Sequence, residues 1–198
     1  AEIVGLSFAV EPDAGWYLPI LFPKKEKTLF GGGDDLSTVL SVLKPILEDE
    51  SLRKCGQNIK YDMLIMKRHG IELKGVQFDT MIAAHLIRPE ARSYKLDYLS
   101  QEHLNYTMQP ITDLIGSGKG QKRMNEVPLK DVSFYATEDA DVCFQLVPIL
   151  KHKLEEALLE KFYHQVEVPL LPALVTMEND GVYVDETLMR EMSQWMEK

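Results

Sequence analysis

Gln57-Asn58-Ile59-Lys60-Tyr61-Asp62 and Tyr135-Ala136-Thr137-Glu138-Asp139 are the two stretches that decide how this chain is interpreted. Residues four apart on a helix share a face, so the spacing predicts that Asn58 lies above Asp62 and that Tyr135 lies above Asp139. Divalent metals bind hard oxygen ligands, and a neighbouring hydroxyl can orient an attacking water. A carboxylate with a polar neighbour on each of two helices is therefore what a two-metal site that cleaves phosphodiesters requires.

Each motif has a simpler interpretation when it is taken alone. An aspartate such as Asp62 on a helix is usually solvated, although Gln57 and Asn58 place it at a strand-to-helix junction, where α/β sheets often carry their sites. Asp139 stands in a cluster of three carboxylates, which repel one another unless a cation or exposure to water relieves them. Tyr135 can hold a water or pack against the core. The two motifs together are more specific than either one.

The composition is that of an ordinary globular protein. The chain has 198 residues, 45% of them hydrophobic and 27% charged, enough for one α/β domain with an appendage. Its net charge of −9 argues against a broad nucleic-acid-binding surface. It does not exclude a deep site that takes one strand end, because metal ions supply the positive charge there. No apolar run is long enough to cross a bilayer, and no signal peptide opens the chain.

The cysteines and histidines show no spacing typical of a metal site. Cys55 and Cys143 lie in apolar surroundings and are expected to be buried free thiols in a reducing cytoplasm. The five histidines are scattered, so none of them is expected to be a ligand.

Hydrophobic periodicity and turn residues place the expected elements. The strands are expected at 3–10, 16–21, 54–57, 76–78 and 182–184. The helices are expected at 36–47, 58–69, 80–87, 95–104, 129–159 with a bend or break near Pro148, 166–179, and from Glu186 onward. Asp79 and Asp185 are the expected N-caps of two of them. Strands first, then strands interleaved with helices, indicate an α/β fold.

Two polar stretches are expected to be loops. The first is Lys24–Asp35, whose three consecutive glycines lack the neighbours that a phosphate-binding loop requires. The second lies within Asn105–Pro128 and contains the basic run Gly116–Arg123. Lys119 in this run is a candidate contact to a phosphate backbone, and a solvated loop explains it equally well.

The residues of the two motifs resemble a known family. Gly56–Asp62 is similar to the second exonuclease motif of bacterial DNA polymerase I, and Tyr135–Val142 is similar to the third. The resemblance runs along nearly the whole chain and also covers the segments 4–9, 43–50, 70–73, 78–81 and 167–172. Residues Asn179–Val182 look like the entry into the polymerase module.

The resemblance implies a ribonuclease-H-like (DnaQ-type) exonuclease fold, a mixed sheet flanked by helices, with its first strand missing from this chain. The implied activity is 3′→5′ proofreading, in which two divalent metal ions, Mg²⁺ or else Mn²⁺ or Zn²⁺, support hydrolysis at the 3′ end of single-stranded or frayed DNA. An exonuclease domain would span 1–163, and 164–198 would begin the polymerase module. The implied setting is the bacterial cytoplasm, near the nucleoid, with no membrane and no separate partner protein.

The roles of individual residues are implied by the same resemblance. Asp139 would hold the metal that binds the attacking water, and Asp62 would reach the second metal. Tyr135 would help to orient the water. Contacts to the nucleic acid are expected from three residues of the first motif and from the basic run, namely Gln57, Asn58, Tyr61 and Lys119.

The chain departs from the family pattern at one decisive place. The first motif of the family, an Asp-x-Glu on the first strand, lies just upstream of the part that matches Ile3–Val10, and residues 1–10 contain no such motif. Two carboxylates of the site would then be absent, so we expect the chain alone to be nearly inactive as a nuclease. A second departure is Asp113-Leu114, where the family often carries an aromatic residue.

Two other functions are weighed against this one. A non-catalytic domain of the same fold could brace the polymerase module, but a decayed site usually loses its carboxylates and its tyrosine, and here they are present. An RNA-trimming exonuclease similar to ribonuclease D is the other alternative. The tail from Val166 to Lys198 argues against it, because this tail looks like the start of a polymerase.

Overall fold

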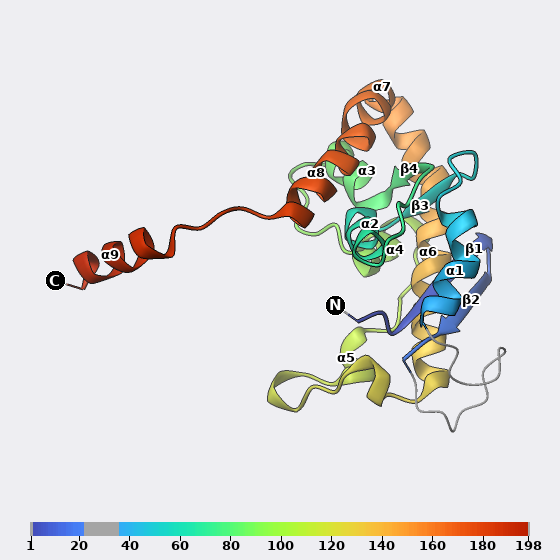
Figure 1. Ribbon diagram of the computed structural model, residues 1–198. Helices are drawn as coiled ribbons and strands as arrows, with labels where there is room; N and C mark the ends of the chain where they lie inside the picture. Colours follow the sequence, from blue (N-terminus) through green and yellow to red (C-terminus); the bar gives the residue numbers. More distant parts are fainter. Residues whose placement is uncertain (1, 22–35, 198) are drawn as a thin grey trace.

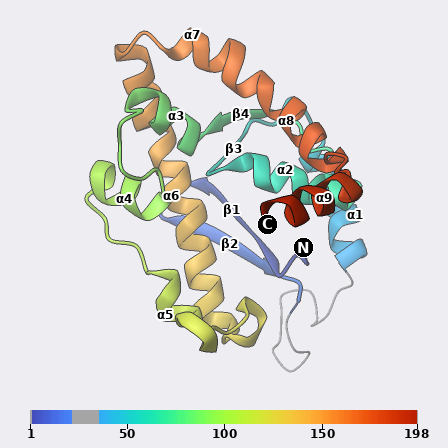
Figure 2. The same ribbon diagram turned by 90° about the vertical axis from the view of Figure 1, so that its left-hand side faces the viewer.

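The computed structural model describes residues 2–21 and 36–197. Within these residues the strands form two pairs, and the long helix α6 (Leu129–Glu156) contacts both of them (Figure 1). Figure 2 shows the two pairs placed along this one helix. The loop expected over Lys24–Asp35 lies outside the described residues.

The first pair is an antiparallel hairpin of β1 (Gly5–Glu11) and β2 (Ala14–Pro19). The turn between them is fastened to α6, because the Asp13 N–H donates to Asp141 Oδ1 over 2.9 Å. Gly15 packs directly on the helix, where an added Cβ would lie 2.8 Å from the Cβ of Thr137. The hairpin therefore rests on the part of α6 that carries the second motif.

The second pair consists of the parallel strands β3 (Lys54–Gly56) and β4 (Val76–Asp79). A parallel pair needs a crossover, which α2 (Ile59–Arg68) provides. α1 (Leu36–Leu47) precedes this unit, and α3 (Thr80–Ile87) follows directly on β4. The first motif thus lies at the junction between β3 and α2.

The segment between α3 and α6 contains more structure than the sequence indicated. After α4 (Leu96–Leu104), the stretch expected to be irregular forms the short helix α5 (Ile111–Ile115) and two single turns, Gly118–Gly120 and Met124–Glu126. Leu114 and Val127 from this stretch pack with Val132 of α6. These apolar contacts fold the stretch back onto α6, although its sequence lacks a clear periodicity.

The C-terminal part begins with α7 (Glu160–Phe162) and one π-helical turn, Tyr163–Glu167. α8 (Val168–Asp180) then packs on α2, and its Leu171 and Val175 are buried against that helix. α9 (Glu186–Met196) extends away from the body (Figure 1), and its apolar side chains are exposed. No helix within the described residues is both long enough and apolar enough to span a membrane.

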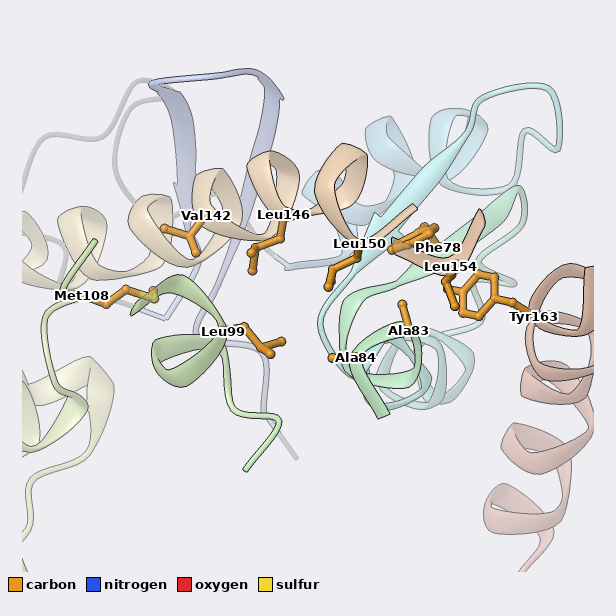
Figure 3. Packing of buried hydrophobic residues seen from close by; sticks show 10 residues of the cluster. All are labelled: Phe78, Ala83, Ala84, Leu99, Met108, Val142, Leu146, Leu150, Leu154 and Tyr163. Carbon is orange, nitrogen blue, oxygen red and sulfur yellow. The ribbon is translucent and has the colours of Figure 1, made fainter. Parts of the chain in front are cut away.

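The main core gathers around the middle and C-terminal half of α6 (Figure 3). Leu146, Leu150 and Leu154 recur every four residues on one face of this helix and are fully buried. They pack with Phe78, with the two alanines of α3 and with Tyr163. A bend or a break was expected near Pro148. α6 continues through Pro148, so there is no break.

Asp79 joins two helices through one buried carboxylate. Its Oδ1 accepts from the N–H groups of Met81 and Ile82 over 2.9 and 3.1 Å, which confirms it as the N-cap of α3. The same carboxylate accepts from the Ile59 N–H over 2.7 Å and from the Asn58 N–H over 3.3 Å, at the start of α2. The first N–H groups of a helix have no partner within the helix, and the Asp79 carboxylate accepts such groups at the starts of both α2 and α3.

We expect Asp79→Ala to lower the free energy of unfolding by about 3 kcal/mol, because two helix caps are lost and buried N–H groups are left unpaired. Urea unfolding monitored by circular dichroism measures this loss. Asp185→Ala is the matched control, since Asp185 caps α9 through the N–H groups of Thr187 and Leu188. Because α9 is not packed on the body, its loss should be below about 0.5 kcal/mol. Equal losses in the two variants would contradict the double role of Asp79.

Candidate active site

Asn58 precedes α2 instead of belonging to it. Its backbone is left-handed, with φ 55° and ψ 45°, and its side chain makes no capping hydrogen bond. Asn58 thus stands at the N-cap position, four residues before Asp62, and its pairing with Asp62 stays a prediction. The Asp79 carboxylate takes the capping role, and Asn58 tolerates the left-handed conformation better than most residues do. Its side chain is left exposed at the mouth of the β3–α2 junction.

Gln57 is held at both ends of its amide. Its Nε2 donates to the Tyr94 carbonyl oxygen over 2.7 Å, and its Oε1 accepts from the Thr80 hydroxyl. Thr80 also donates to the Gly56 carbonyl oxygen over 3.2 Å. The side chain of Gln57 is therefore fixed in the protein, whereas its neighbour Asn58 and the 56% exposed Tyr61 face solvent.

Asp62 lies in the first turn of α2. Solvent reaches its exposed side chain, while the protein atoms around it remove part of its hydration and raise its pKa to about 6. The negative charge of Asp79 adds to this rise. A carboxylate that is costly to ionise in this place gains from a bound cation.

Tyr135 and Asp139 meet on one face of α6, as their spacing predicted. The Tyr135 hydroxyl hydrogen-bonds the Asp139 carboxylate, and both side chains are half-buried. Burial, together with the charges of Glu138 and Asp97, raises the pKa of Asp139 to about 7, and the hydrogen bond from Tyr135 opposes this rise. Burial and the Asp139 charge raise the pKa of Tyr135 to about 12, so it stays a hydrogen-bond donor at neutral pH.

The three crowded carboxylates of this motif have separate environments. Glu138 is 9% exposed and accepts from the Tyr106 hydroxyl over 2.7 Å and from the Gln109 N–H over 2.9 Å. Asp141 accepts from Asp13 of the hairpin turn and, over 2.8 Å, from Gln145. Internal hydrogen bonds thus relieve two of the three charges. Asp139 differs from them, because its partner is the single hydroxyl of Tyr135.

Sequence reasoning missed Asp97. It lies in the first turn of α4, is exposed, and its charge acts on both Tyr135 and Asp139. No spacing in the sequence links residue 97 to residue 139, because packing of α4 against α6 brings them close. Asp97 therefore joins the candidate site on tertiary evidence alone.

The predicted residues form two groups around different neighbours. Asp62 responds to the charge of Asp79, whereas Asp139 responds to those of Glu138 and Asp97, and the convergence of Asp62 with Asp139 stays a prediction. Among the described residues no group of three His, Cys, Asp or Glu is arranged to hold a metal ion. Lys119 is exposed in the single turn Gly118–Gly120 that follows α5.

The comparison with protein families decides the classification. A family model described as "3'-5' exonuclease" matches residues 4–155, which include both motifs and the hairpin. The chain belongs to this exonuclease family. The similarity that the two motifs indicated is therefore confirmed over most of the chain.

Curated relatives of the chain are named DNA polymerase I. The one from Rhizobium leguminosarum is 36% identical over 207 residues, and the match covers 98% of this chain and 20% of the relative. The one from Pseudomonas aeruginosa is 32% identical, and the match covers 99% of this chain and 22% of the relative. The chain thus spans about a fifth of the length of these relatives.

Solved structures share the fold. The structure titled "POL domain of Pol1 from M. smegmatis complex with DNA primer-template and dNTP" has a TM-score of 0.66 at 22% identity, with 91% of this chain and 27% of that chain covered. "Brucella melitensis NrnC bound to pGG" has a TM-score of 0.62 at 19% identity, with 84% and 71% covered. The expected α/β exonuclease fold, ribonuclease-H-like in class, is confirmed. Within the described residues, however, the expected mixed sheet consists of two separate pairs, the antiparallel β1–β2 and the parallel β3–β4, because no pairing joins β1 or β2 to β3 or β4.

The raised pKa of Asp139 leads to a prediction about stability and pH. The pKa of this carboxyl is near 3.8 in the unfolded chain and about 7 in the folded chain, so the folded chain binds the proton more tightly. The contribution of Asp139 to stability is therefore fully present below pH 3.8 and is lost as the pH rises toward about 7. We expect the melting temperature of wild type, measured in EDTA, to fall relative to that of Asp139→Asn across this window.

The comparison must be made between variants, because burial lowers the pKa of His103, which acts on stability in the opposite direction. Asp131→Asn, which removes an exposed carboxylate from the first turn of the same helix, is the matched control. It should follow wild type at every pH. A constant difference between wild type and Asp139→Asn from pH 4 to pH 8 would contradict the prediction.

Proposed function

We propose that this chain is the proofreading exonuclease domain of a bacterial DNA polymerase I and hydrolyses the 3′-terminal phosphodiester of single-stranded or frayed DNA. The observation that carries the proposal is the hydrogen bond between Tyr135 and Asp139 on α6, in a chain of the 3′-5′ exonuclease family. The relatives named DNA polymerase I support the choice of parent protein. Such a protein works in replication and repair, in the bacterial cytoplasm at the nucleoid.

The residues fit divalent metal ions. Asp62 and Asp139 are carboxylates whose ionisation the folded chain disfavours, and a cation relieves that cost. Asp139 would hold the ion next to the attacking water and Asp62 the second ion. A related nuclease structure is titled "Brucella melitensis NrnC with bound Mg2+", which supports Mg²⁺, with Mn²⁺ or Zn²⁺ as substitutes. When bound, such ions activate a water and neutralise charge that develops on the phosphate.

The chain supplies positioning around that chemistry. Tyr135 keeps its proton and fixes the Asp139 carboxylate, and its hydroxyl oxygen can still accept a hydrogen bond from a water. Asn58 and Tyr61 are exposed beside Asp62, so an amide and an aromatic ring are available to terminal nucleotides. Gln57, through its bonds to Tyr94 and Thr80, fixes the β3–α2 junction from which Asn58 and Tyr61 extend. Lys119 would contact the phosphate backbone further along the strand.

The sequence contains no Asp-x-Glu, so the carboxylates that complete a two-metal site in this family are not among its 198 residues. We expect magnesium-dependent release of nucleotides from a single-stranded DNA 3′ end by the purified chain to be at least about 100-fold slower than by a polymerase that carries the whole domain. The assay is single-turnover cleavage of a labelled oligonucleotide. Equal rates would remove the missing motif from the mechanism.

The domain division also remains a proposal. Residues 164–198 would lead into the polymerase module, following a boundary at residue 163. The packing of α8 on α2, reinforced by a 2.9 Å bond from Lys67 Nζ to Thr176 Oγ1, favours a boundary after Asp180 instead. α9 would then be the first element of the module, which would cover its exposed Leu188, Met192 and Trp195.

The test of the proposed function uses the full-length polymerase that carries this domain. Asp139→Asn should slow removal of a 3′-mismatched nucleotide by about 100-fold or more and leave nucleotide addition unchanged, because Asp139 serves only the exonuclease site. Tyr135→Phe should slow removal less, since it keeps the carboxylate. Asp131→Asn is the control and should match wild type in both assays.

Each contrary outcome identifies a different function. Wild-type mismatch removal by Asp139→Asn would leave a non-catalytic domain that braces the polymerase. Loss of both activities together with a lower melting temperature would make Asp139 structural. Faster cleavage of an RNA oligonucleotide than of the matching DNA would favour the ribonuclease alternative.

A further inference from the structure

The two cysteines of the chain meet in the core. Cys55 lies on β3 and Cys143 on α6, 88 positions apart in the sequence (143 − 55). Their thiols hydrogen-bond to each other, although neither strand pairing nor helix spacing requires these two positions to be close. Cys143 is 6% exposed, whereas Cys55 is half-buried and is the more exposed of the two. Both cysteines of a 198-residue chain thus belong to one contact.

This contact belongs to the network behind the first motif. The Thr80 hydroxyl lies 3.7 Å from Cys143 Sγ and also donates to Gln57 Oε1 and to the Gly56 carbonyl oxygen. Cys55 directly precedes Gly56 and Gln57 in the chain. Cys143 lies one helical turn beyond Asp139. The thiol pair therefore joins the strand that presents the first motif to the helix that carries the second.

The two thiols are chemically unequal. The hydrogen bond from Cys143 lowers the pKa of the Cys55 thiol, because it stabilises the thiolate. The bond to Cys55 and burial raise the pKa of Cys143. The more accessible sulfur is thus also the better nucleophile, with a second thiol beside it to complete an exchange.

We propose that Cys55 and Cys143 form a reversible disulfide when the protein meets hydrogen peroxide or a small-molecule disulfide. With hydrogen peroxide, Cys55 attacks one peroxide oxygen, the O–O bond breaks, and a sulfenic acid and water form. The Cys143 thiol then attacks the Cys55 sulfur, the S–O bond breaks, and a second water leaves with the Cys143 proton. In total, two thiols are oxidised and one peroxide is reduced to two waters.

With oxidised glutathione the same pair reacts by exchange. The Cys55 thiolate attacks one sulfur of glutathione disulfide and releases one glutathione, which leaves a mixed disulfide on Cys55. The Cys143 thiolate then displaces the second glutathione. Two reduced glutathiones are formed for each protein disulfide, so hydrogen atoms and electrons balance.

The cross-link goes beyond the proposed function and has a structural consequence of its own. It ties β3 to α6. It also removes the Cys143 thiol, which Thr80 contacts, and Thr80 in turn holds the side chain of Gln57. Because it closes a long loop, it restricts the unfolded chain and should raise the melting temperature by about 5 °C or more. The two motif-bearing elements would be locked together until a thiol reductant releases them.

The decisive experiment uses the wild-type chain and counts thiols. Native protein is incubated with glutathione disulfide or with hydrogen peroxide, quenched, denatured, and titrated with a thiol reagent, in parallel with intact mass and a non-reducing gel. We expect both thiols to disappear together, the mass to fall by two hydrogen atoms, the chain to stay monomeric, and dithiothreitol to reverse every change. The melting temperature should rise in the oxidised sample only.

Three results would overturn the proposal: both thiols remain titratable, glutathione accumulates on Cys55 while Cys143 stays free, or the disulfide links two chains. Cys143→Ala should instead trap the mixed disulfide on Cys55, without the rise in melting temperature. Cys55→Ala should leave Cys143 unreactive in the native state. If an alanine variant does not fold, the serine variant at the same position is used, and the wild-type thiol count decides in either case.

Discussion

A single buried carboxylate sets the geometry on which the rest of the structure depends. Asp79 is 1% exposed and accepts N–H groups from the starts of both α2 and α3, over 2.7 to 3.3 Å. Burial raises its pKa, and these bonds oppose that rise. Its backbone is also engaged, because the Tyr163 hydroxyl accepts its N–H over 2.6 Å and donates to its carbonyl oxygen. The helix that carries Asp62 and the C-terminal segment are thereby fixed to one residue.

α6 positions the other half of the candidate site. Its apolar face supplies the three fully buried leucines of the main core, and its polar face carries three carboxylates within four residues. Glu138 fixes the segment after α4, and Asp141 fixes the hairpin turn. Because these two carboxylates already bind neighbouring segments, Asp139 is the one of the three for which we propose a metal ion. Within one motif, Glu138 and Asp141 thus stabilise the fold, and Asp139 is the proposed functional residue.

Local patterns predicted much of this fold. The hairpin, the helix 36–47, the helix 80–87 with its Asp79 cap and the helix from Glu186 appear close to their expected bounds, because apolar periodicity and capping residues act over a few positions. α5 was missed, since Leu114 is buried by contact with α6 and not by a helical pattern. The left-handed backbone of Asn58 was not predicted, because its N–H bonds to Asp79, 21 residues later.

The sequence by itself determined the family and the pairing of Tyr135 with Asp139, because motif identity and helical spacing are local properties. Only the tertiary structure decided which carboxylates are spent on hydrogen bonds, since Glu138 and Asp141 bind donors 29 to 128 positions away. It also decided that Asp97 lies near Asp139 and that the two cysteines touch. Burial and long-range packing set these pKa values and contacts. Both arise only when distant segments of the chain have come together.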